Sequence, residues 1–98
     1  MFIRLVKMTF ESDRIEEFLD IFDSSKDAIR AYGGCNQLEL YRDKTDPNVF
    51  FTYSIWDSEQ HLDQYRNSEL FNRVWGKTKL LFSSTPQAWS VDKIVSLP

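Results

Sequence analysis

The order in which two hydrophobic periodicities follow one another restricts the fold of this chain more than any other feature of its sequence. Four segments are expected to form β-strands, namely residues 2–10, 35–43, 49–56 and 88–96, and residues 35–43 alternate as a half-buried strand does. Two segments have apolar side chains at helical spacing, namely residues 15–29 and 70–82. The sequence therefore predicts the order strand, helix, strand, strand, helix, strand in an α+β fold.

Local signals mark the ends of the first predicted helix. Ser12 or Asp13 can cap its beginning, and Leu19 belongs to its apolar stripe. Gly33 and Gly34 follow the last apolar residue, as the glycines after a helix commonly do. The first helix is therefore expected to end just before this glycine pair.

The second half of the chain contains a turn and a helix break. Residues 44–48 have the composition of a turn, so the strands on either side are expected to form an antiparallel hairpin. Asp57 or Ser58 can cap the start of a short helix, and Asn67 and Ser68 can end it and start another. The second helical region is therefore expected in two pieces.

This order favours a ferredoxin-like βαββαβ sheet, antiparallel, with both helical regions on one face. Residues 2–10 and 49–56 nevertheless carry large apolar side chains on both of their faces. The chain has no further element to cover the second face, and a second copy of the chain is the simplest cover. We expect residues 1–98 to form a single domain that assembles as a homodimer.

Charge and hydropathy exclude several kinds of partner. Twelve Lys and Arg against 15 Asp and Glu give a net charge of −3, and no basic stripe is present, which argues against nucleic acid. No apolar run reaches the roughly 18 residues that a membrane span requires. Arg4 and Lys7 interrupt the apolar N-terminus, so it does not read as a signal peptide. We expect a cytoplasmic protein.

Single copies of two residue types limit the chemistry that one chain can perform. Cys35 is the only cysteine and His61 the only histidine. An internal disulfide or a cysteine metal cluster cannot form, and a zinc site or a histidine triad would depend on His61 alone. We therefore expect no metal and no cofactor. The 15 aromatic residues, eight Phe, four Tyr and three Trp, indicate a dimer interface, a ligand cavity or both.

Several of these features together resemble the antibiotic biosynthesis monooxygenase family of dimeric α/β-barrel proteins. Nearly the whole chain takes part, and the most specific stretch is a strand that ends in Trp56, a helix start at Ser58, and Ser68 three residues before Phe71. The resemblance implies a homodimeric barrel with a pocket between sheet and helices in each protomer. It also implies oxidation of quinol-like or polyphenolic substrates by O₂ without metal or flavin.

The same resemblance extends to proteins that degrade haem, and here the sequence excludes that activity. The haem-degrading branch has an Asn on the first strand, a Trp on a helix and a His further along. This chain has no Asn on the first strand, and Tyr65 and Trp75 stand at the corresponding helix positions. No histidine is left to serve as an axial ligand.

Two residues are candidates for catalysis. Trp56 can form the wall of a pocket and stack on a planar substrate, or it can simply fill the core between sheet and helix. Tyr65 can donate a hydrogen bond to a substrate oxygen or a developing oxyanion, or it can be a half-buried tyrosine whose hydroxyl meets water.

A second group is predicted to line the substrate pocket. Tyr53, Phe71 and Trp75 can complete an aromatic cavity around a flat molecule, although an aromatic stripe at helical spacing also fits a plain core. His61 can act as a base or lie exposed on its helix. Cys35 reads as a small buried core residue.

A third group lies on the strand of residues 35–43. Arg42, Glu39 and Tyr41 can pair across strands at the dimer interface or lie on a solvated strand face.

The resemblance thus implies a cofactor-independent monooxygenase that acts on an electron-rich phenol or quinol. Such a substrate can itself pass an electron to O₂ once it is deprotonated, so that the protein needs a dry aromatic pocket and a group that handles the proton or the oxyanion. The alternative is a non-catalytic dimeric module that binds a small planar aromatic ligand.

Overall fold

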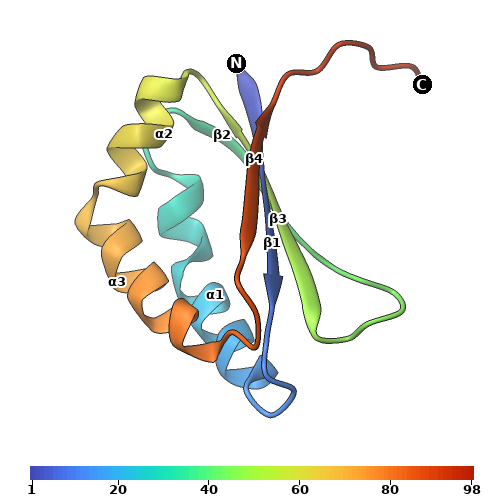
Figure 1. Cartoon of the computed structure of the whole chain (residues 1–98). Coiled ribbons are helices and arrows are strands. Elements are labelled where there is room, and N and C mark those ends of the chain that lie inside the picture. The colour runs from blue at the N-terminus through green and yellow to red at the C-terminus, as the bar shows by residue number, and fades with distance from the viewer.

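The computed structural model describes residues 1–98 and contains four strands and three α-helices in the predicted order (Figure 1). The elements are β1 (Phe2–Thr9), α1 (Ile15–Arg30), β2 (Cys35–Arg42), β3 (Val49–Trp56), α2 (Glu59–Arg66), α3 (Glu69–Thr78), a short 3₁₀ turn (Lys79–Leu81) and β4 (Gln87–Val91). The predicted hairpin and the two-piece second helical region are confirmed. No helix is both long and apolar enough to cross a membrane.

The strands form one antiparallel sheet in the order β2-β3-β1-β4, and all the helices lie against one side of it (Figure 1). This arrangement confirms the ferredoxin-like α+β fold. The side of the sheet that faces the helices is called the inner face; Val6 on β1 and Thr52 on β3 are paired there. The opposite side is called the outer face, and it carries the alternate residues of each strand, such as Leu5 and Tyr53.

The apolar core between sheet and helices consists of two clusters rather than one. The larger cluster gathers Met8, Phe10, Ile15, Phe18, Phe50 and Leu81. The smaller cluster gathers Phe2, Cys35, Trp56 and Leu62 at the other end of the inner face. Cys35 is therefore the buried core residue that the sequence predicts, and burial raises the pKa of its thiol.

Serine caps fix the starts of α2 and α3. The backbone N–H of His61 donates a hydrogen bond to Ser58 Oγ, and the N–H of Phe71 donates one to Ser68 Oγ. Of the two predicted caps for α2, Asp57 and Ser58, the structure uses Ser58, and the predicted cap at Ser68 is confirmed.

The start of α1 differs from the prediction. Arg14 occupies the cap position and no side chain caps the helix, so neither Ser12 nor Asp13 does so. The N–H of Arg14 instead donates to the backbone carbonyl of Glu11, closing a turn. Leu19 is partly exposed instead of being part of the buried stripe, because it lies at the edge of the face that packs on the sheet.

The last strand is shorter than the predicted segment 88–96. β4 pairs only with β1, and Val91 is opposite Ile3 near the beginning of that strand. Because Asp92 would lie opposite Phe2, the first residue of β1, the residues after Asp92 have no strand left to pair with. They leave the sheet as an extended tail (Figure 1).

Candidate functional site

A cavity of about 260 Å³ lies between the inner face of the sheet and the helices. Its wall includes Met8 and Phe18 from the larger core cluster and Trp56 and Leu62 from the smaller one, so the cavity separates the two clusters. Ligand pockets generally hold about 300–1,000 Å³, so this one suits a molecule with two or three fused rings better than a bulky cofactor.

Four aromatic residues form a continuous wall of the cavity from the end of β3 along α2 and α3. The ring centroids of Trp56 and Tyr65 are 5.1 Å apart in a stacked arrangement, and those of Tyr65 and Phe71 are 5.2 Å apart edge to face. Phe71 and Trp75 stack at 5.8 Å with nearly parallel planes. The structure thus brings four of the five predicted site residues to one cavity.

Trp56 is the innermost member of this wall. Its side chain is only 1% exposed, and its indole N–H already donates to Ser54 Oγ at 2.9 Å. Tyr65 stacks on its face, and both residues line the cavity. Trp56 therefore packs against the tyrosine ring and helps to hold its position.

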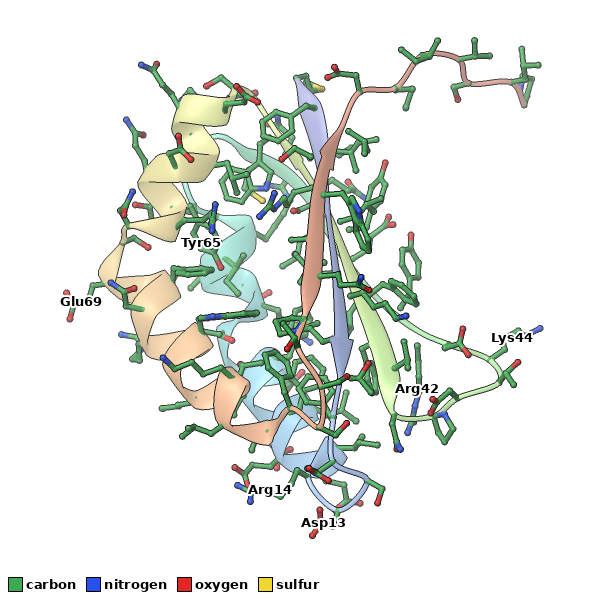
Figure 2. All side chains as sticks on the ribbon, in the orientation of Figure 1. Asp13, Arg14, Arg42, Lys44, Tyr65 and Glu69 are labelled. Atoms are coloured by element: carbon green, nitrogen blue, oxygen red, sulfur yellow. The ribbon has the colours of Figure 1, made fainter.

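Tyr65 lies on the side of α2 that faces the sheet (Figure 2). Burial raises the pKa of its phenol well above the ordinary value, and nearby Cys35 adds to the rise. Its hydroxyl makes no hydrogen bond within the chain, and no buried polar side-chain atom lacks a partner, so the hydroxyl retains access to solvent. Tyr65 is therefore a protonated hydrogen-bond donor available to a ligand.

The charged side chains of the cavity are two arginines. Arg4 extends from the inner face of β1, and Arg66 from the last turn of α2. No Asp, Glu or His lines the cavity, so none of its side chains can accept a proton near neutral pH. Neither arginine is among the site residues predicted from the sequence, although Arg4 shares the period-two row of Val6 and Met8.

Tyr53 corrects the prediction that it lines the pocket. It is paired with Leu5 and Glu39 on the outer face of the sheet, and its nearest aromatic partner is Tyr41 at 6.4 Å. Side chains alternate between faces along a strand, and Tyr53 is an odd number of residues from Trp56. It therefore points away from the cavity.

The remaining polar candidates also lie outside the cavity. His61 Nδ1 is 2.7 Å from Ser58 Oγ at the start of α2, where it supports the helix cap. The Tyr41 hydroxyl donates a hydrogen bond to the Glu39 carboxylate on the outer face. Arg42 belongs to the opposite face and lies over the ring of Phe50, so it does not form a set with the other two.

No group of three or more His, Cys, Asp or Glu side chains is placed to hold a metal ion. The chemistry of the cavity therefore rests on its aromatic wall, the Tyr65 hydroxyl and the two arginines.

Comparison with protein families gives a match over most of the chain. The family model for antibiotic biosynthesis monooxygenase matches residues 1–75, a segment that includes all the predicted site residues. A comparison with curated proteins finds no match.

Solved structures share the fold at low sequence identity. A crystal structure of an antibiotic biosynthesis monooxygenase has a TM-score of 0.91 at 18% identity and covers 97% of this chain and 100% of its own. A conserved protein of Methanosarcina mazei has a TM-score of 0.88 at 20% identity, covering 95% and 93%. A Mycobacterium tuberculosis protein has a TM-score of 0.87 at 15% identity, covering 99% and 98%.

Proposed function

The chain belongs to the antibiotic biosynthesis monooxygenase family, and on that premise we propose that it is a cofactor-independent monooxygenase acting on a quinol-like or polyphenolic small molecule. The observation that carries the proposal is the Tyr65 hydroxyl, a hydrogen-bond donor free of protein partners on the wall of an aromatic cavity. Phe71 and Trp75 would flank the substrate rings, and Trp56 would support Tyr65 from behind.

The proposed reaction draws its electrons from the substrate. In an anthrone, a CH₂ carbon joins two aromatic rings, and loss of a proton leaves an electron-rich enolate that can pass an electron to O₂. Overall, the CH₂ becomes C=O with one atom of O₂, and the other atom leaves as water with the two hydrogens. No outside reductant is required.

Tyr65 has a defined part in this scheme. Negative charge sits on the substrate oxygen once the proton has left, and a preorganised hydroxyl in an apolar site stabilises such an oxyanion more than water does. The proton itself passes to water, because no side chain of the cavity is a base near neutral pH. The protein therefore orients the substrate, surrounds its rings with apolar side chains, and donates a hydrogen bond to its oxyanion.

The second candidate function is a module that binds a planar aromatic ligand without converting it. The absence of Asp, Glu and His from the cavity wall favours this alternative, because these side chains are the common proton acceptors near neutral pH. Ligand binding without oxygen uptake would support it.

An oxygen electrode distinguishes the two functions. Purified protein is mixed with a panel of anthrones and hydroquinones, and uptake is expected to exceed the spontaneous rate. Ala88→Phe narrows the cavity from the β4 side, and we expect it to lower the enzymatic rate on the order of tenfold. Ala28→Phe, on the exposed side of α1, is the matched control and should retain the rate. Uptake no faster than the spontaneous rate across the panel contradicts the monooxygenase.

We also propose that the protein works as a cytoplasmic homodimer. No helix covers the outer face, and its side chains project away from the sheet on the side opposite the helices (Figure 2). The central row across that face runs through Tyr53, Leu5 and Trp89, and Trp89 is 44% exposed. A second copy placed on this face would remove apolar surface from water.

A further inference from the structure

Arg4 is a cation in an apolar cavity with almost no compensation from the protein. It shares the inner face of β1 with Val6 and Met8, and its only side-chain hydrogen bond is to Ser90 Oγ at 3.0 Å. The two ion pairs of the structure join Arg14 to Glu17 and Lys26 to Asp23 and so do not involve it. Most of its N–H donors are left for water or a ligand.

Arg66 adds a second positive charge to the same cavity from the helical side. Burial lowers the pKa of Arg4, and the nearby Arg66 charge lowers it further, while Asp63 partly opposes the change. Asp63 is exposed and forms no ion pair with either arginine. Two like charges therefore share one apolar cavity without a carboxylate between them, an arrangement that an anion would stabilise.

We propose, as an extension of the proposed function, that the ligand of this cavity is an aromatic acid whose carboxylate binds Arg4 and Arg66. Guanidinium and carboxylate match each other in planar, paired hydrogen bonds, which makes the charged end of such a ligand specific. The rings lie in the apolar part of the cavity along Phe71 and Trp75. A ligand with rings alone would leave the two arginines without a partner, and a ligand with a carboxylate alone would leave the aromatic wall without one.

A matched pair of ligands tests this assignment. Naphthalene-2-carboxylate and naphthalene-2-carboxamide have the same rings and shape but differ in charge, and their dissociation constants are measured by calorimetry at neutral pH. The wild-type protein should bind the carboxylate on the order of tenfold more tightly than the amide.

Substitutions then show which residues cause the protein to bind the carboxylate more tightly than the amide. Arg4→Gln should remove most of the preference for the carboxylate over the amide, and Arg4→Lys should restore part of that preference. Arg66→Gln should have a smaller effect because Arg66 is exposed, and the exposed Arg73→Gln, outside the cavity, should have none. Thermal unfolding of each variant shows that it is folded.

Ser90→Ala separates charge recognition from a structural tether. It removes the bond that joins Arg4 to β4 but keeps the positive charge, so the preference for the carboxylate should persist. Equal binding of the two ligands by the wild type, or loss of the preference in Ser90→Ala to the same extent as in Arg4→Gln, overturns the assignment. Amide binding would in that case leave the aromatic cavity of the proposed function intact. Binding of neither ligand overturns the assignment and the cavity together.

Discussion

The packing of Tyr65 affects both the position of its ring and the pKa of its phenol. Packing against Trp56 and Phe71 holds its ring, and the same packing raises the pKa of its phenol. A raised pKa keeps the proton on the hydroxyl, so the group donates hydrogen bonds over a wider pH range than an exposed tyrosine. The aromatic wall thus stabilises the structure and also sets the protonation state of the proposed donor.

Tyr65→Phe should keep the stacking but remove the donor. We expect the rate of enzymatic oxygen uptake to fall about tenfold to a hundredfold, with little change in the melting temperature. Since burial raises the pKa of Tyr65, the wild-type rate should show no loss from tyrosine ionisation up to a pH of about 10, the ordinary tyrosine value. An unchanged rate in the variant would exclude Tyr65 from the reaction.

Gly34 is a second residue whose role is fixed by geometry. Its φ is +92°, and a Cβ added there would lie 2.4 Å from the Cβ of His61. Gly34→Ala should therefore lower the free energy of unfolding by about 1–3 kcal/mol, as measured by urea denaturation. The matched control is Gly33→Ala, where an added Cβ meets nothing within 4 Å and the change should stay within about 0.5 kcal/mol. Equal effects at both positions would contradict the steric explanation.

Some residues of the candidate site can be predicted from the sequence, and others cannot. Trp56 and Phe71 stand in recognisable positions relative to Ser58 and Ser68, and their place at one cavity follows from the element order. Tyr53 was assigned to the pocket because it is aromatic, although the alternation of its own strand puts it on the other face. Arg4 was overlooked because a charged residue in a strand reads as a surface residue until the covered face is known.

The break between α2 and α3 positions the aromatic wall. Ser68 Oγ donates to the Tyr65 carbonyl at 2.6 Å and accepts from the Phe71 N–H at 3.1 Å, so one hydroxyl joins the end of one helix to the start of the next. The two wall residues on either side of the break are therefore held in fixed relation by a backbone contact.

Ser68→Ala should cost about 1 kcal/mol of unfolding free energy, the usual effect of losing an N-terminal helix cap. It should also weaken binding of aromatic ligands, because Phe71 follows the freed end of α3. Ser96→Ala in the exposed tail is the control for both measurements. Full stability in Ser68→Ala would show that tertiary packing alone sets the helix start.

Local signals predicted the starts of α2 and α3 but not the start of α1, where neither Ser12 nor Asp13 caps the helix. The caps of α2 and α3 are set by neighbouring residues, with Ser58 chosen over Asp57 and Ser68 as predicted. The end of β4 depends instead on where β1 begins, about 90 residues away in sequence. An apolar tail that includes Ile94 and Val95 continues the strand pattern after the pairing has ended.

At the scale of the whole molecule, the inner face of the sheet carries the candidate site, and the outer face carries the proposed dimer interface. The helices cover the inner face and enclose the cavity, whereas the outer face is uncovered and carries Leu5 between Tyr53 and Trp89. The excess of aromatic residues noted in the sequence is thus divided between a ligand site and a surface suited to a partner.

Leu5→Glu tests the proposed homodimer. A carboxylate in the middle of the outer face would be buried without a partner if two copies met there, so the variant should sediment as a monomer while the wild type sediments as a dimer. Gln64→Glu on the exposed side of α2 adds the same charge elsewhere and should leave the dimer intact. A monomeric wild-type protein at micromolar concentration would rule out this assembly.

The fate of the oxygen atoms tests most directly whether the protein is a cofactor-independent monooxygenase. Purified protein is incubated with an anthrone under isotopically labelled O₂, and the product is analysed by mass spectrometry, with unlabelled product in labelled water as the control for exchange. We predict one labelled oxygen atom per product molecule and a much lower yield with Ala88→Phe. A product without label, or the same yield with and without protein, would contradict the proposed reaction.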